Sequence, residues 1–118
     1  MKVLIISVVL LFVASAPFAQ TITVTFVNPG HKQSNPTGAF WQNVTRVMEA
    51  AAQDLDIKLT TLYAERNHIH MKKLAQNALN TKADYLILVD EKGVITNALL
   101  TVPGEHKRVA FCLIVRIN

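Results

Sequence analysis

The sequence predicts an α/β fold in which a parallel sheet carries helices on both faces. Short apolar and β-branched runs alternate along the chain with segments whose apolar residues recur at helical spacing. The run Tyr85–Val89 is apolar without alternation, which is typical of a parallel strand covered on both faces. The resulting order, βαβαβαβ, requires right-handed crossovers between parallel strands.

The first half of this pattern is a strand, a polar loop and a long helix. Residues 22–27 alternate apolar side chains with Thr and end at Asn28-Pro29-Gly30, the pattern of a strand followed by a break. From Gly38 the period becomes that of an amphipathic helix of about four to five turns, which Thr37 can cap. Its apolar stripe consists of Phe40, Trp41, Val44, Val47, Met48, Ala51, Ala52 and Leu55. We expect this stripe to pack against the sheet.

The second half continues the alternation. Residues 57–62 predict a second strand, Asn67 can cap a second helix, and residues 85–89 form the third strand. A third helix is expected from residue 93 to about 102, and a fourth parallel strand over residues 109–115. This last run is too apolar for an exposed sheet edge, so another element should cover it.

The first residues predict export. Met1-Lys2 followed by VLIISVVLLFVA is a basic start and an apolar run too short to span a bilayer, as in a secretory signal peptide. Cleavage is expected after Ala16 or Ala19. We therefore assign residues 1–19 to a signal peptide and residues 20–118 to a single domain.

Composition and motifs argue against several classes of protein. The 12 Lys and Arg residues are spread along the chain, so no nucleic-acid partner is expected. His68 and His70 open a helix, which points their side chains about 200° apart and disfavours a metal pair. Gly30 and Gly38 do not form a nucleotide-binding motif. The lone Cys112 lies in a predicted buried strand, where packing is its usual role. We expect no disulfide, catalytic residue, metal or cofactor.

Candidate binding residues gather at one edge of the predicted sheet. In an open parallel sheet, ligands are met outside the carboxyl ends of the strands. Phe40 and Trp41 lie on the first turn of a helix at this edge, and adjacent helical residues cannot both point into the core. We expect one ring to form an apolar wall for a sugar; the alternative is that it only starts the core stripe. Asn28 and Asp90 end two strands, and they either bind hydroxyl groups or close their own turns.

Three segments carry a resemblance to a known family. They are TITVTFVNPG, GAFWQNVTRVMEAAAQDLDIKLTTLY and ADYLILVDEKGV. In this order they resemble the N-terminal lobe of type I periplasmic solute-binding proteins, the sugar-binding and autoinducer-binding family. The resemblance covers residues 21–95 well and residues 96–118 loosely. It implies a periplasmic protein, not an enzyme, whose two lobes close on a small polar solute and deliver it to an ABC-type membrane transporter or a sensor.

The resemblance also implies which residues bind the solute. In this family an aromatic residue at the start of the first helix stacks on the sugar, and polar residues after the first, third and fourth strands bind its hydroxyl groups. The ligand-binding residues expected here are Asn28, Phe40, Trp41, Asp90, Glu91, Arg116 and Asn118.

The sequence departs from the family in length. Two lobes need roughly two domains of chain, and only one partial lobe is expected here. We expect a truncated product; the alternative is that a partner chain supplies the remainder. Two further hypotheses are a secreted small flavodoxin-like enzyme or cofactor carrier, and a non-functional remnant.

Overall fold

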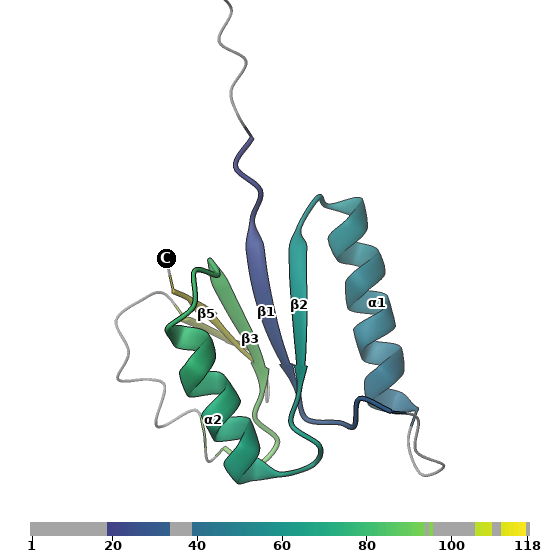
Figure 1. Cartoon of the computed structure of the whole chain (residues 1–118), viewed down its shortest axis with the longest axis vertical. Coiled ribbons are helices and arrows are strands. Elements are labelled where there is room, and N and C mark those ends of the chain that lie inside the picture. The colour runs from purple at the N-terminus through teal and green to yellow at the C-terminus, as the bar shows by residue number, and fades with distance from the viewer. Residues whose placement is uncertain (1–18, 34–38, 94, 96–105, 110–111, 118) are drawn as a thin grey trace, which may run out of the picture.

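The computed structural model describes residues 19–33, 39–93, 95, 106–109 and 112–117 (Figure 1). Its elements are β1 (Thr23–Asn28), α1 (Phe40–Asp54), β2 (Lys58–Tyr63), α2 (His68–Leu79), β3 (Tyr85–Val89), β4 (His106–Val109) and β5 (Cys112–Arg116). Within this part of the chain the strands form one sheet of five, in the order β2-β1-β3-β5-β4. The chain therefore has the predicted α/β fold.

The parallel half of the sheet is centred on β1. This strand pairs in parallel with β2 on one side and with β3 on the other, and the three arrows point the same way in Figure 1. Every residue of β1 from Val24 to Asn28 is buried. The carboxyl ends of β1, β2 and β3 consequently lie together at one edge of the sheet, which we call the carboxyl edge.

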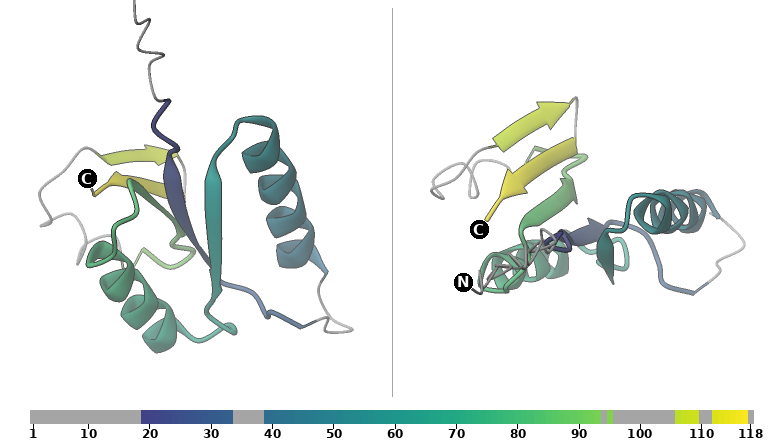
Figure 2. Two further views of the ribbon diagram at one scale, coloured as in Figure 1. Left: turned by 45° about the horizontal axis from the view of Figure 1, so that its top comes forward. Right: turned by 90° about the horizontal axis from the view of Figure 1, so that it is seen from above.

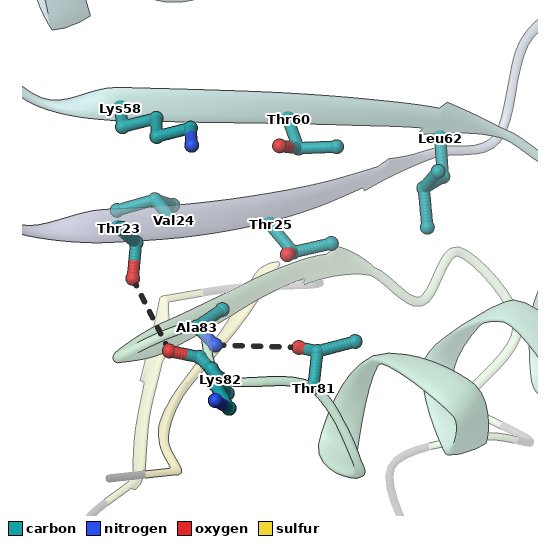
Figure 3. Close-up of a pocket in the computed structure, with 9 residues that line it drawn as sticks. All are labelled: Thr23, Val24, Thr25, Lys58, Thr60, Leu62, Thr81, Lys82 and Ala83. Atoms are coloured by element: carbon teal, nitrogen blue, oxygen red, sulfur yellow. Dashed lines mark hydrogen bonds between the residues drawn. The ribbon is translucent and has the colours of Figure 1, made fainter.

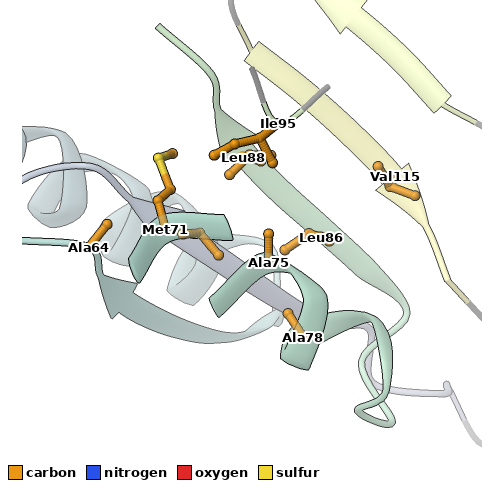
Figure 4. Packing of buried hydrophobic residues seen from close by; sticks show 9 residues of the cluster. Ala64, Met71, Ala75, Ala78, Leu86, Leu88, Ile95 and Val115 are labelled. Carbon is orange, nitrogen blue, oxygen red and sulfur yellow. The ribbon is translucent and has the colours of Figure 1, made fainter. Parts of the chain in front are cut away.

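The two helices cover opposite faces of the sheet, as predicted (Figure 2). On one face α2 lays Met71, Ala75 and Ala78 against alternate residues of the strands, among them Leu86 and Leu88 (Figure 4). These small and flexible side chains let the helix approach the sheet closely. On the other face, the hydroxyl of Thr45 on α1 accepts hydrogen bonds from the side chains of Asn28 on β1 and Tyr63 on β2.

The helix starts differ from one another. Asn67 caps α2 as predicted, because its side-chain oxygen accepts from the backbone N–H of His70 at 3.0 Å. Helix α1 begins at Phe40 with Ala39 at the N-cap position, and no side chain caps it. The predicted cap, Thr37, lies outside the described residues, as does most of the third helix expected over residues 93–102.

The apolar stripe of α1 is only partly buried. Thr45 and Ala52 are the buried residues of this helix, whereas four residues of the predicted stripe are exposed: Phe40, Val47, Ala51 and Leu55. The expectation that the whole stripe packs on the sheet was wrong for these four side chains. The physical reason is that α1 leans mainly on the edge strand β2, so its stripe is wider than the surface available to it.

The last strands correct the prediction of a fourth parallel strand over residues 109–115. The run is divided between β4 and β5, which pair antiparallel with each other, and β5 also pairs antiparallel with β3. The direction of β4 is therefore that of β3, but β5 is inserted between them. Because β4 flanks it, the apolar strand β5 is not a sheet edge, in line with the expected need for cover.

At the opposite edge of the sheet, Asp84 ties the start of β1 to the start of β3. Its Oδ2 accepts from the backbone N–H of Thr23 at 2.8 Å and from the Thr23 hydroxyl at 2.9 Å. These bonds, the backbone one first, lower the pKa of Asp84 below its ordinary value of 3.8.

The Asp84 bonds predict a loss of stability in acid. A lowered pKa in the folded state means that the carboxylate stabilises the fold above the unfolded-state pKa, and that this contribution disappears as the pH falls through the folded-state pKa. We expect Asp84→Asn to melt at a lower temperature near neutral pH and to lose less on acidification than the wild type. Thermal unfolding at a series of pH values measures both. Parallel pH profiles for the two proteins would contradict the prediction.

Candidate functional site

The loops that follow β1 and β2 are joined by backbone hydrogen bonds at the carboxyl edge. The N–H groups of Ala64, Glu65 and Arg66 donate to the carbonyls of Asn28 (2.8 Å), Gly30 (3.0 Å) and Pro29 (2.9 Å), respectively. Each loop therefore satisfies polar groups of the other. Because these hydrogen bonds fix the backbone of both loops, the side chains at the carboxyl edge have defined positions.

The side chain of Asn28 is buried and fully engaged inside the protein. Its Nδ2 donates to the Trp41 carbonyl at 2.9 Å and to the Thr45 hydroxyl at 2.8 Å. Its Oδ1 accepts from the backbone N–H of Gly30 at 2.7 Å. Both amide protons are used. Of the two roles that the sequence left open, the geometry supports the closing of the turn.

The two aromatic residues lie where they were predicted, on the first turn of α1. Their rings are 5.0 Å apart at an interplanar angle of 82°, an edge-to-face pair. Phe40 is 65% exposed, whereas Trp41 is half-buried against Gly30. As expected, the two adjacent rings do not both point into the core. Phe40 is the ring that is available at the surface.

Asp90 and Glu91 follow β3 at the same edge but differ in exposure. Asp90 is buried, and its Oδ2 accepts from the backbone N–H of Ile95 at 3.1 Å, so it closes the turn after β3. Glu91 is at the surface, where its Oε2 lies 3.0 Å from Nη1 of Arg66. Glu91 can therefore meet a ligand, whereas Asp90 acts mainly on the backbone.

Arg116 does not join these residues. It ends β5, and because β5 runs antiparallel to β3 it lies opposite Tyr85, at the start of that strand. The prediction that Arg116 lies at the carboxyl edge was wrong because it assumed a parallel fourth strand. Asn118 lies outside the described residues.

Two further side chains at this edge, His31 and Glu65, were not singled out from the sequence. Nδ1 of His31 lies 2.7 Å from Oε2 of Glu65, and Oε1 of Glu65 accepts from the backbone N–H of Lys32 at 3.0 Å. The bond from Lys32, followed by that from His31, lowers the pKa of Glu65 below its ordinary value. Glu65 is therefore held as a carboxylate between the loops. Residues 63–67 follow the second predicted strand, and the sequence pattern identified no role for any of them.

Glu65 and its neighbour Arg66 adopt a backbone conformation that is unfavourable for their residue types. Their φ angles are 53° and 58°, and the N–H of Asn67 donates to the Ala64 carbonyl at 2.9 Å, closing a tight turn around them. Positive φ costs an ordinary L-residue about 1–2 kcal/mol. The surrounding hydrogen bonds hold the turn in this state.

Two hollows lie away from the carboxyl edge. The first, of about 340 Å³, opens on the sheet face beside the end of α2 and contains none of the predicted site residues (Figure 3). It is lined by Thr23, Val24, Thr25, Lys58, Thr60, Leu62, Thr81, Lys82 and Ala83. The second, of about 360 Å³, lies at the opposite edge and includes Arg116 and Asp84.

No cluster of three or more His, Cys, Asp or Glu side chains suited to a metal ion occurs among the described residues. Burial raises the pKa of the Cys112 thiol, which favours its uncharged form. No helix in the described ranges is both long and apolar enough to cross a membrane.

Comparisons with known proteins do not assign the chain to a family. No protein-family model, no curated protein and no solved structure matched it.

The engagement of Asn28 predicts that it contributes to stability. Asn28→Asp keeps the shape of the side chain but removes both N–H donors and places a carboxylate against two oxygen atoms. We expect the free energy of unfolding to fall by about 2 kcal/mol or more, as measured by urea denaturation. Asn43→Asp, at an exposed position of α1, is the matched control and should change little. Equal stability of the two variants would show that the Asn28 bonds are unimportant.

The contact between Gly30 and Trp41 predicts a second stability effect. A Cβ at residue 30 would lie 2.3 Å from Cβ of Trp41, an atom too close to the backbone to move freely. We expect Gly30→Ala to cost about 1–3 kcal/mol and to change the fluorescence of Trp41, the only tryptophan. Gln33→Ala, exposed in the same loop, serves as the control. An unchanged melting temperature and emission spectrum for Gly30→Ala would refute the contact.

Proposed function

We propose that this chain binds a small polar solute, a sugar or a sugar-like signal, at the carboxyl edge of its sheet. In this proposal it serves uptake or sensing in the periplasm, as the solute-binding lobe that its sequence resembles, and it passes the solute to a membrane transporter or sensor. No bond of the solute is broken. Lobe closure, which belongs to the resemblance, would shift the population toward the form that docks on the membrane partner.

The observation that carries the proposal is the exposed ring of Phe40. Phe40 presents a ring that is 65% exposed at the carboxyl edge, the edge at which open α/β sheets meet their ligands. Trp41 packs against it edge to face, and Trp41 is itself seated on Gly30. The ring of Phe40 is thus a supported wall, suited to the C–H face of a sugar ring.

Polar groups along the same edge complement this wall. His31, Glu65, Arg66 and Glu91 follow the ends of three adjacent strands, and all four are at least partly open to solvent. A solute that presents an apolar face and a rim of hydroxyl groups could use both kinds of surface. A flat apolar ligand or a bare ion would use only one of them.

Titration with monosaccharides, followed by proton–nitrogen correlation NMR, tests the proposal. This method detects dissociation constants of about 1 mM and weaker, as expected for a single lobe. Glucose, galactose, ribose and arabinose form a suitable panel. We expect one of them to shift the unique indole N–H resonance of Trp41 and the amides of residues 28–33 and 63–67. No shift with any sugar would refute the proposal.

Removal of the rings should weaken this binding. We expect Phe40→Ala and Trp41→Ala to raise the dissociation constant by about three- to tenfold, the usual contribution of an aromatic contact. Amide shifts report the affinity in both variants. Val47→Ala is the matched control, since Val47 is equally exposed on the same helix but two turns away from the edge. If both aromatic variants bind as tightly as the wild type, the aromatic wall has no role.

A further inference from the structure

The turn between β2 and α2 combines a strained backbone with two charged side chains. Positive φ at both central positions of a tight turn is typical of Asn and Gly, which adopt this conformation most easily. Here the two positions are Glu65 and Arg66, with φ angles of 53° and 58°. The backbone conformation does not require Glu and Arg at these positions, because an Asn-Gly pair would form the same turn with less strain.

The two side chains extend in different directions along the carboxyl edge. Glu65 meets His31 and Lys32, in the loop after β1. Arg66 meets Glu91, in the segment after β3, with Nη1 at 3.2 Å and 3.0 Å from the two carboxylate oxygens. The strained turn is therefore bonded to the segments that follow β1 and β3, to one through an acidic side chain and to the other through a basic one.

Both side chains retain hydrogen-bonding capacity. A carboxylate has about four acceptor positions, and described residues occupy two of those of Glu65. A guanidinium has five N–H donors, and the bonds of Arg66 to Glu91 involve Nη1 alone. The side chains of Glu65 and Arg66 are each 47% exposed. By contrast, both amide protons of Asn28 are already committed inside the protein.

We propose that Glu65 and Arg66 are hydroxyl-binding residues of the solute site, and that the solute is an uncharged polyol. The inference rests on the proposed function and adds two binding residues to it. The hydroxyl groups of a sugar both donate and accept, so different hydroxyl groups of one solute can bond to the Glu65 carboxylate and to the Arg66 guanidinium. The guanidinium of Arg66 already has the carboxylate of Glu91 beside it, which weakens the attraction that a sugar acid or sugar phosphate would need.

Conservative variants test the two residues. We expect Glu65→Gln and Arg66→Lys each to raise the dissociation constant of the bound sugar by about tenfold, because each loses charge-assisted or paired hydrogen bonds. Amide shifts give the affinity. The corresponding sugar phosphate and sugar acid are titrated in parallel, and both should bind more weakly than the neutral sugar. Tighter binding of either anion would overturn the assignment of an uncharged solute.

A variant with relieved backbone strain distinguishes a binding role from a structural one. We expect the double variant Glu65→Asn with Arg66→Gly to melt at the wild-type temperature or above it, and to bind the sugar at least tenfold more weakly. Asp56→Gly is the matched control, since Asp56 also has positive φ (54°) but follows α1, on the far side of the sheet. It should melt no lower than the wild type and leave the affinity unchanged.

The outcomes separate this inference from the proposed function. If Phe40→Ala weakens binding while Glu65→Gln, Arg66→Lys and the double variant do not, the aromatic wall stands and the two residues have no role in binding. If the double variant melts well below the wild type while the single variants bind normally, the turn is structural and the inference fails. If the wild type binds no sugar, both proposals fall.

Discussion

The hydrogen bonds of one buried amide determine how the first helix meets the sheet. Asn28 is the last residue of the central strand, and its side chain joins that strand to the carbonyl of Trp41 and the hydroxyl of Thr45 on α1. Helix α1 has no side-chain cap and few buried residues of its own. This connection therefore holds the first turns of α1 at the end of β1, together with the half-buried side chains of Trp41, Val44 and Met48. Trp41 lies against Gly30 in the same turn, and Phe40 next to it is exposed.

The polar groups of the carboxyl edge fall into two sets, one buried and one near solvent. Asn28 and Asp90 point inward and satisfy backbone groups, because a buried polar atom without a partner would cost about 1–3 kcal/mol. The outward set comprises Glu65, Arg66 and Glu91, whose bonds are made near solvent and leave further capacity. Residues at a strand end or one position beyond it thus build the edge, and residues two or three positions beyond a strand face outward from it.

Hydrophobic periodicity was enough to predict the parallel half of the fold. β1, β2, β3, α1 and α2 lie within a residue or two of their predicted bounds, since their patterns are long and regular. The run over residues 109–115 was misassigned because an apolar segment does not reveal that it is divided between two antiparallel strands, and strand direction was inferred from element order alone. Arg116 was misplaced for the same reason. Glu65 and Arg66 were missed because neither residue type marks a turn with positive φ.

The energetics of that turn bear on why its residues are Glu and Arg. Two ordinary residues with positive φ cost about 2–4 kcal/mol together. The contact of Glu65 with His31 and the ion pair of Arg66 with Glu91 lie near solvent, where such pairs contribute little to stability, so they do not offset this strain. The backbone bonds to Gly30 and Pro29 would persist with any residues at the turn. The stability of the fold thus does not account for the two side chains, whereas a contact made with a bound solute would.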